Sequence, residues 1–324
     1  MTQPVRLLIL GTGTVGSSIG LALRRASPDI ERVGYDPRGE AAQSAHKAAA
    51  VDRVVSRPSK GAGDADLVIL TLPAAAATTA AENLDGALRP DTVVLCTARL
   101  HGRLMEDVRS RLGPANPCLG AVPFLGPQHA LRPEADSQVP AADLFDGGLL
   151  GIVAPPGTSQ AALDLTLELA AVLHATPFFL DPAELDSAAA TSDEFPVMLA
   201  AALFESLMTN PGWRDQRRLV GRSFSRLAGL LEGNPAEGAA EWIANRESLL
   251  ARLDALANEL ADLRDLLSGE DERGLAERLD AAASHYREWR AFRASPPPDD
   301  GVAPRALAGT GLIDRLLGGR RSRA

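Results

Sequence analysis

The chain has 324 residues, a length that suits two domains better than one or three. Its net charge is −9 and its pI is near 5.2, so no basic face is available to neutralise phosphates, and nucleic acid is excluded as the main partner. No apolar run reaches the roughly 18 charge-free residues of a membrane span, and the first strand pattern begins too early for a signal peptide, so we expect a cytoplasmic protein.

The first predicted elements are a strand, a glycine turn and a helix. An apolar run over residues 5–10 leads directly into Gly11-Thr12-Gly13-Thr14-Val15-Gly16, and a helical pattern follows at once. A second short strand, residues 32–35, ends at Asp36. Glycines at this spacing, between a strand and a helix and followed by an acid at the next strand end, are typical of a dinucleotide-binding fold.

Each residue type in this turn suits a bound nucleotide. Gly11 permits the sharp exit from the strand, Gly13 removes the Cβ that would block a pyrophosphate, and Gly16 lets the helix lie close to the sheet. The helix begins near Thr14 and Val15, where its N–H groups and positive dipole end would face the phosphates. We therefore predict that these five residues bind the cofactor.

The identity of the cofactor is predicted from the acid that follows the second strand. Asp36 can accept hydrogen bonds from both ribose hydroxyls and would repel a 2′-phosphate, which favours NAD. Arg38, two residues further on, would tolerate that phosphate, so NADP stays open. Leu72 and Pro73 end a later strand where the ribose and nicotinamide would pass, and they complete the predicted cofactor site.

Strand patterns alternate with helical patterns as far as residue 180, which predicts a Rossmann-type, doubly wound parallel sheet over residues 1–180. The remaining strands are expected at 51–55, 65–73, 92–96, 117–124, 149–153 and 177–180, and helices at 41–50, 104–112 and 160–174. Residues 125–147 lack periodicity and predict a long loop across the cleft mouth. Cys96 and Cys118 lie in two of the strands without C-x-x-C spacing, so we expect buried thiols and no redox or metal site.

The pattern becomes entirely helical at residue 181 and stays so to about 293, which predicts a second, all-α domain. Asp181 is the expected N-cap, Pro182 the first helical residue, and Glu184 completes a capping box. Leucines then recur every three or four residues from Leu249 to Leu267, and the same stepping returns after a break, so we predict a helical hairpin. Two explanations of these leucines stay open: a core within one chain, or a dimer seam over part of the surface.

Residues 294–324 predict a disordered basic tail. Residues 295–310 are rich in proline and lack an apolar periodic pattern, and an amphipathic stretch over residues 311–317 is followed by Arg320, Arg321 and Arg323. A solvated tail and a docking motif are the two interpretations of this segment.

The chain resembles the prephenate dehydrogenase family over about residues 5–290. The glycine turn with its acid, the strand at 67–73 and the order of the domains are similar. More specific are residues 211–219 (PGWRDQRRL), which are similar to the family's Gly-Phe-Arg-Asp-x-x-Arg-Ile. Residues 241–250 (EWIANRESLL) are similar, with altered spacing, to its Trp-x-x-Ile-x-x-x-Asn-x-x-x-Leu. The resemblance implies oxidative decarboxylation of prephenate or arogenate in tyrosine biosynthesis, by a homodimer formed through the helical domain.

The resemblance also implies the residues that bind substrate. Arg218 falls on the family's substrate-binding arginine and, with Arg214 on the same segment, is our candidate to hold a substrate carboxylate. A surface helix charge is the alternative interpretation of Arg218.

Three motifs differ from the family pattern at the reacting centre. Residues 120–126 (GAVPFLG) carry Val122 where the family has its proton-handling histidine, and residues 193–197 (DEFPV) replace two histidines and bring in Asp193 and Glu194. Residues 97–102 (TARLHG) lack the family's serine and lysine. Valine cannot accept a proton, and loss of a general base costs about 10² to 10⁴-fold in rate. The two acids would repel a dicarboxylate unless Arg99, Arg214 or Arg218 compensates.

No catalytic residue is assigned from the sequence. His129 follows the altered segment 120–126, and His101 lies near the carboxyl end of the strand at 92–96. Both are candidates for a substitute base, although a solvated loop histidine is the expected state of each. Two hypotheses of function remain: an NAD(P)-dependent dehydrogenase with a rearranged base or a less anionic substrate, and a catalytically silent NAD(P)-binding sensor or regulator of the same fold.

Overall fold

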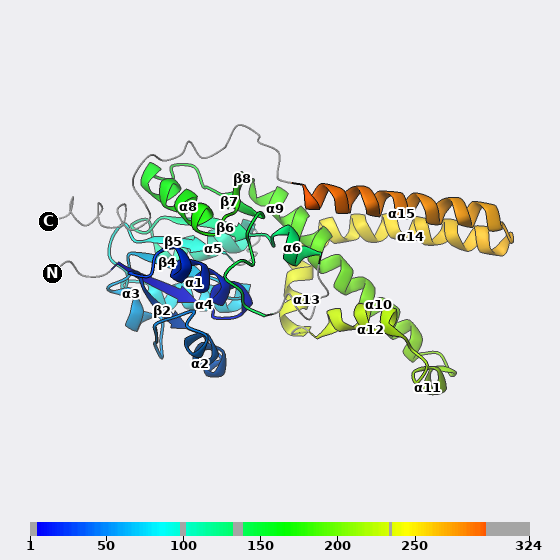
Figure 1. Cartoon of the computed structure of the whole chain (residues 1–324), viewed down its shortest axis with the longest axis horizontal. Coiled ribbons are helices and arrows are strands. Elements are labelled where there is room, and N and C mark those ends of the chain that lie inside the picture. The colour runs from blue at the N-terminus through cyan, green and yellow to red at the C-terminus, as the bar shows by residue number, and fades with distance from the viewer. Residues whose placement is uncertain (1–4, 98–101, 132–138, 233–234, 296–324) are drawn as a thin grey trace. The chain divides into compact units, whose positions relative to one another are not determined.

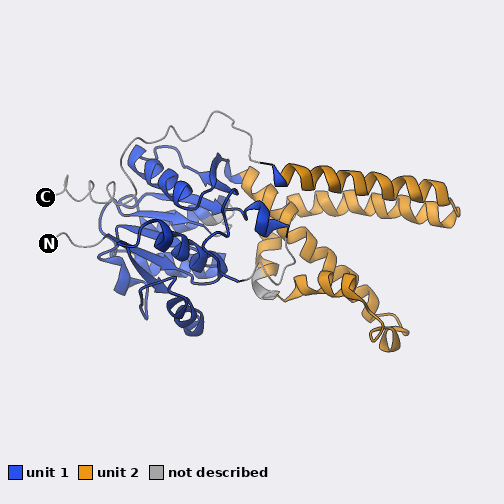
Figure 2. Ribbon diagram, in the orientation of Figure 1, with its two compact units in different colours: residues 1–182, 294–324 blue, residues 183–293 orange. Residues whose placement is uncertain are grey.

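The computed structural model describes residues 5–97, 102–131, 139–232 and 235–295, and these form two compact units. Unit 1 comprises residues 5–182 and unit 2 comprises residues 183–293 (Figure 2). None of the helices in the described ranges is both long and apolar enough to span a membrane. The arginine-rich tail predicted beyond residue 295 lies outside the described residues.

Unit 1 is built on one eight-stranded sheet in the order β3-β2-β1-β4-β5-β6-β7-β8 (Figure 1). The strands are β1 (Arg6–Leu10), β2 (Glu31–Tyr35), β3 (Arg53–Val54), β4 (Leu67–Leu70), β5 (Val93–Cys96), β6 (Cys118–Pro123), β7 (Leu149–Val153) and β8 (Thr176–Phe179). The predicted doubly wound α/β fold is confirmed. One pair, β6 and β7, is antiparallel, which the sequence did not indicate.

Helices cover both faces of the sheet. They are α1 (Thr14–Ala26), α2 (Gly39–Lys47), α3 (Ser59–Ala62), α4 (Ala74–Leu84), α5 (Gly102–Leu112), α6 (Pro127–Ala130) and α8 (Gln160–Val172). Because successive strand residues point to opposite faces, Leu67 and Ile69 of β4 pack in the core with α1 and α8. Val68 and Leu70 pack in a second core with α4 and α5. Strands buried on both sides account for the nearly continuous apolar runs in the sequence.

The connection from β6 to β7 is more structured than the long loop predicted for residues 125–147. It contains the short helix α6, and Gly126 N–H donates to the Leu144 carbonyl at 3.0 Å. Leu144 and Phe145 are buried in the core on the α1 side. The connection thus returns the chain beside β6, where β7 pairs with it in the reverse direction.

Unit 2 is entirely helical, as predicted. Its elements are α9 (Pro182–Ala189), the π-helical turn η1 (Ala190–Glu194), α10 (Phe195–Met208), α11 (Trp213–Gln216), α12 (Arg222–Ala228), the 3-10 turn η2 (Gly229–Leu231), α13 (Pro235–Ala244), α14 (Arg246–Ser268) and α15 (Glu272–Ala294). Helices α14 and α15 form the expected hairpin (Figure 1), and Arg278 of α15 pairs with Glu259 and Asp262 of α14.

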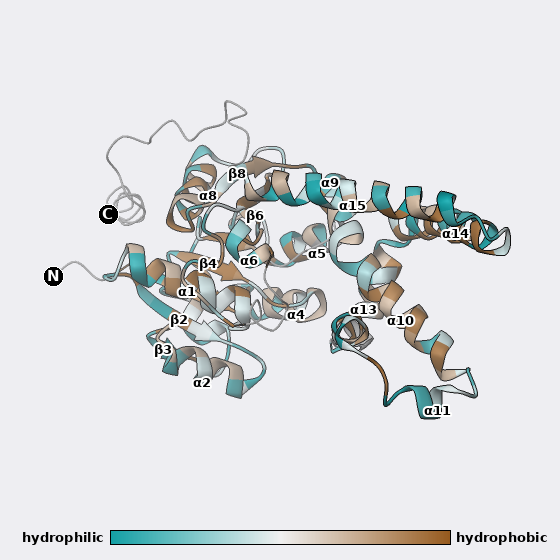
Figure 3. Ribbon diagram, turned by 45° about the vertical axis from the view of Figure 1, so that its right-hand side comes forward, coloured by the Kyte–Doolittle hydropathy of each residue, from teal (hydrophilic) through white to brown (hydrophobic). Residues whose placement is uncertain are grey.

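The leucine row of the hairpin is only partly covered within the chain. Leu249 is buried, whereas Leu260 and Leu267 are 55% and 64% exposed. Large apolar side chains are also exposed on α15, and Figure 3 shows apolar residues along most of α10. The contacts within one chain therefore cover only part of the apolar surface of unit 2.

Candidate functional site

The glycine turn between β1 and α1 has the geometry that a nucleotide phosphate needs. Gly11 has a φ of 100°, and a Cβ there would lie 2.5 Å from Thr71 Oγ1. A Cβ on Gly16 would overlap the carbonyl oxygen of Gly11. A Cβ on Gly13 would find open space, with Arg38 Nη2 at 3.8 Å as its neighbour. Two glycines therefore keep the turn tight against the sheet, and the third leaves a gap above it.

Helix α1 presents its amino end at this gap. Gly13 is the N-cap and supplies no capping side chain, and the first turn, which includes Thr14 and Val15, holds no acidic residue. An uncapped helix start of this kind favours an anion through its N–H groups and its dipole. Ser17 Oγ donates to the Thr12 carbonyl at 2.8 Å, and this hydrogen bond ties the glycine turn to the first turn of α1.

Asp36 joins the end of β2 to the glycine turn. Its side chain is 3% exposed, and it accepts hydrogen bonds from Thr12 N–H at 2.8 Å and Arg38 N–H at 2.9 Å. Thr12 Oγ1 also donates to Oδ2 at 3.4 Å, whereas Oδ1 retains a lone pair that can accept from a ribose hydroxyl. The Arg38 side chain is 76% exposed, and its Nε lies 3.5 Å from the carboxylate. A buried acid and an exposed cation thus lie together beside Gly13.

The end of β4 completes this edge of the sheet. Leu72 is buried and Pro73 is the exposed N-cap of α4. Thr71, which the sequence analysis missed, binds the turn directly: its N–H donates to the Leu10 carbonyl at 2.7 Å and its Oγ1 donates to the Gly11 carbonyl at 2.5 Å. The β1–β4 pairing ends at Leu10 and Leu70, so the residue after β4 lies beside the glycine turn. A prediction that β1 and β4 are neighbours would have identified Thr71.

Val122 lies near the carboxyl end of β6, opposite Gly151 of β7, and is buried. His129 lies in α6, a few residues beyond the same strand end. The expectation of a solvated loop histidine is wrong for His129, because its side chain is 6% exposed. Its Nε2 lies 3.3 Å from Asp143 Oδ1, and within the described ranges neither ring nitrogen makes an aligned hydrogen bond. A buried imidazole without such a bond is rare and calls for a functional or structural explanation.

Glu194 ends the π-helical turn η1 in unit 2. It is buried, and Asn245 Nδ2, at the start of α14, donates to its Oε1 at 2.6 Å. Asp193 accepts a hydrogen bond from Ser192 Oγ at 2.8 Å. Single π turns inserted between α-helices occur often at functional sites. Asn245 is the second residue that the sequence analysis did not single out.

Arg214 and Arg218 lie on and just after α11, and both are exposed. The segment is held by an aromatic cluster in which the Trp213 ring lies 6.2 Å from Phe204 and 5.4 Å from Phe224. The cluster fixes the backbone and leaves the two guanidinium groups in solvent. Arg99 and His101 lie outside the described residues, and no group of metal-ligating side chains occurs among those that the structure describes.

Two family models match the chain. The model for the prephenate dehydrogenase nucleotide-binding domain matches residues 19–155, and the model for the prephenate dehydrogenase dimerization domain matches residues 181–281. A probable prephenate dehydrogenase, NovF, of Streptomyces niveus is 28% identical over 268 residues, which cover 81% of this chain and 68% of that protein. Prephenate dehydrogenase of Lactococcus lactis is 24% identical over 281 residues, covering 83% of this chain and 73% of its own.

Solved structures show the same fold. Prephenate dehydrogenase of Aquifex aeolicus, in complex with hydroxyphenyl propionate and NAD⁺, superposes with a TM-score of 0.74 at 21% identity, covering 89% of this chain and 99% of that one. Arogenate dehydrogenase of Synechocystis gives a TM-score of 0.66 at 20% identity, covering 88% and 100%.

Proposed function

The chain belongs to the prephenate dehydrogenase family, and from that premise we propose that it is an NAD-dependent dehydrogenase whose nucleotide site is intact and whose reaction site is altered. The observation that supports this most directly is the buried Asp36 hydrogen-bonded to the backbone of the glycine turn. Bound NAD would supply the hydride acceptor. The protein's part is to hold the phosphates at α1 and the adenosine ribose at Asp36.

We propose His129 as the group that accepts the hydroxyl proton. Hydride leaves an alcohol carbon more easily when a base takes that proton, and Val122 cannot do so. His129 follows the same strand end, and the neighbouring Asp143 carboxylate would stabilise the imidazolium that forms. In its favour, His129 is an imidazole beside a carboxylate in the chain segment that directly follows β6.

The proposed substrate is a cyclohexadienol of the prephenate and arogenate type whose net negative charge is lower than that of prephenate. Arg214 and Arg218 are free to bind one carboxylate, because their guanidinium groups are exposed. The buried Glu194 adds a negative charge to unit 2, which favours a substrate of lower net negative charge. Arogenate, in which an ammonium group offsets one of the two carboxylates, suits this balance better than prephenate. A place in tyrosine biosynthesis and a cytoplasmic location follow from this proposal.

The test is cofactor binding followed by turnover. We expect calorimetry to detect NAD, and reduced-cofactor absorbance to rise with arogenate faster than with prephenate. His129→Gln is expected to lower kcat by about 10² to 10⁴-fold while NAD affinity stays unchanged.

The rival function, a silent NAD(P) sensor, is favoured by the valine at position 122. Nucleotide binding without turnover of either substrate would support that rival, and absence of any pyridine nucleotide binding would contradict both.

Cofactor choice gives a second prediction, because Asp36 and Arg38 act in opposite directions on a 2′-phosphate. We expect Arg38→Ala to weaken NADP binding by about 10-fold, equivalent to about 1.4 kcal/mol, and to leave NAD binding nearly unchanged. Asp36→Asn removes the repulsion between the carboxylate and the 2′-phosphate of NADP. It should lower the ratio of the NADP Kd to the NAD Kd by a similar factor. Calorimetric Kd values for both cofactors measure this. Arg57→Ala, which removes an exposed charge elsewhere in unit 1, is the control, and equal losses for NAD and NADP in Arg38→Ala would refute the assignment.

We further propose that unit 2 pairs two copies of the chain. The match to a dimerization domain over residues 181–281 supports this, and so does the exposed apolar surface of the α14–α15 hairpin. We call this surface the hairpin patch; it comprises Leu250, Leu260, Leu267, Leu279, Tyr286, Trp289 and Phe292. Exposed apolar patches of this extent usually mark an interface with another protein.

A further inference from the structure

Two thiols that are far apart in the sequence meet in unit 1. Cys96 ends β5 and Cys118 begins β6, and in the parallel register Cys118 pairs with Val94. Both side chains therefore point to the same face, and their Sγ atoms lie 3.4 Å apart. Both cysteines are free and buried, as expected from the sequence, but they are neighbours rather than separate thiols.

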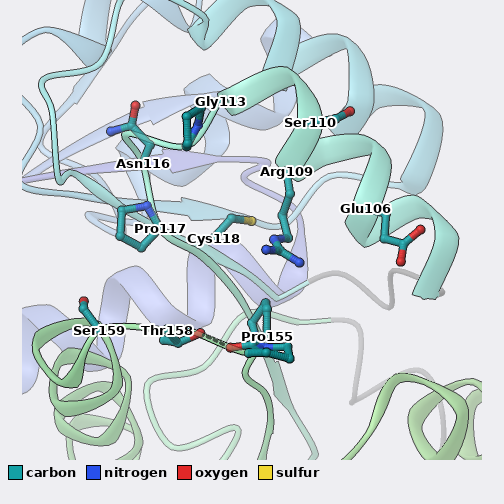
Figure 4. Close-up of a pocket in the computed structure, with 13 residues that line it drawn as sticks. Glu106, Arg109, Ser110, Gly113, Asn116, Pro117, Cys118, Pro155, Thr158 and Ser159 are labelled. Atoms are coloured by element: carbon teal, nitrogen blue, oxygen red, sulfur yellow. Dashed lines mark hydrogen bonds between the residues drawn. The ribbon is translucent and has the colours of Figure 1, made fainter.

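A pocket of about 510 Å³ reaches one member of this pair. It is lined by Cys118, by Glu106, Arg109 and Ser110 of α5, and by the segment from Pro155 to Ser159 (Figure 4). The pocket lies at the amino end of β6, whereas the glycine turn follows the carboxyl end of the parallel strand β1. It is therefore a different place on the sheet from the proposed nucleotide site, and the proposed function makes no use of it.

The pocket is lined by Cys118 and not by Cys96, so a small solute in it would reach Cys118 first. Arg109 and Glu106 of α5 lie on the pocket wall together with Ser159, the N-cap of α8. Cys96 is fully enclosed, and its hydrogen bond with Cys118 together with burial raises its pKa well above the ordinary value. Cys118 is the thiol that lines the pocket, and Cys96 is enclosed beside it.

We propose that Cys96 and Cys118 are a redox modification site that a small hydroperoxide, such as hydrogen peroxide, oxidises to a disulfide. The Cys118 sulfur attacks one peroxide oxygen, the O–O bond breaks, and Cys118 becomes a sulfenic acid as one water leaves. The Cys96 sulfur then attacks the Cys118 sulfur, the S–O bond breaks, and the hydroxyl group leaves with the Cys96 proton as a second water. The two thiols together lose two electrons, which the peroxide accepts.

The strand register predicts that this disulfide is easily reduced. The sulfurs must approach from 3.4 Å to about 2.05 Å. The two cysteines are offset by two residues along neighbouring strands, so the bond must pull on the backbone of a packed sheet. Strained disulfides of this kind have high reduction potentials and belong to the labile class.

The experiment counts thiols in the full-length protein. Reduced protein is treated with hydrogen peroxide while folded, then unfolded and alkylated with N-ethylmaleimide. We expect the alkylated thiols to disappear, the intact mass to fall by two hydrogen atoms, and a peptide map to link Cys96 to Cys118. Dithiothreitol should restore both thiols.

Two variants separate the roles of the cysteines. Cys96→Ser is expected to accumulate a sulfenic acid on Cys118 that dimedone traps, whereas Cys118→Ser should slow oxidation of the remaining thiol by at least about 10-fold. Circular dichroism checks that each variant is folded. If a variant does not fold, the peptide map of the oxidised wild type tests the proposal instead.

The proposal is overturned if both thiols of the folded wild type survive peroxide, or if the only disulfides formed join two chains. These readouts involve no nucleotide and no substrate, so they stand or fall independently of the dehydrogenase function.

Discussion

Purified Gly13→Ala protein is expected to bind NAD at least about 100-fold more weakly than the wild type, a loss of about 2.7 kcal/mol, and to unfold at the same temperature. Residue 13 has a φ of −66° and a ψ of −164°, a conformation that alanine adopts without strain. The added methyl group meets no atom closer than 3.8 Å in the folded protein. It would occupy the gap at the amino end of α1, where the pyrophosphate is proposed to lie.

The neighbouring glycine supplies the contrast. In Gly16→Ala the new methyl group would overlap the Gly11 carbonyl and lie 2.7 Å from Thr71 Oγ1, so the turn itself must shift. We expect about 1–3 kcal/mol of lost stability, or about 2–4 °C in Tm for each kcal/mol. Gly63→Ala, at a φ of −61° with its nearest contact at 3.7 Å, is the control that should change neither property. Wild-type NAD affinity in Gly13→Ala would show that the phosphates do not pass over this turn.

Leu279→Glu is expected to convert a dimer into folded monomers. Leu279 is 70% exposed in the single chain, so a glutamate there costs the monomer little. In a two-fold dimer the substitution occurs twice, and each carboxylate would be buried against the hairpin patch of the partner. We expect the dimer Kd to rise by at least about 100-fold. Light scattering after size-exclusion chromatography measures the mass directly.

The hairpin patch also offers a second position and a matched control. Trp289→Glu, 49% exposed and paired with the Tyr286 ring at 6.0 Å, should have the same effect through the aromatic part of the patch. Lys60→Glu adds the same charged group to the exposed surface of α3 in unit 1 and should leave the mass unchanged. Dimers that persist in both patch variants would place the interface elsewhere on unit 2.

The features that the sequence predicted well are those that depend on a few consecutive residues. The order of strand, glycine turn, helix and acid from Val5 to Asp36 is local, so its geometry follows from the residue types. The helix start at Pro182 is equally local and appears as expected. The cofactor roles assigned to these residues stay predictions, which the variants above address.

The features that the sequence did not predict depend on contacts between distant segments. Strand β6 is apolar on both faces, so its pattern could not show that Cys118 shares a face with Cys96. The burial of His129 depends on how residues 139–148 fold back over α6, and that segment has no periodicity to read. The pairing of Glu194 with Asn245 joins positions that are 51 residues apart.

The π-helical turn at Ala190–Glu194 lies between α9 and α10 in one continuous helical run, so it sets the rotation of α10 relative to α9. Each residue in an α-helix advances the side-chain direction by about 100°, so a single residue gained or lost within this turn would change the face that all of α10 presents. The hydrogen bond from Asn245 to Glu194 ties the end of this turn to the start of α14 in its present orientation. Insertion or deletion of one residue in this turn would therefore rotate α10 as a whole, without a substitution of any of its side chains.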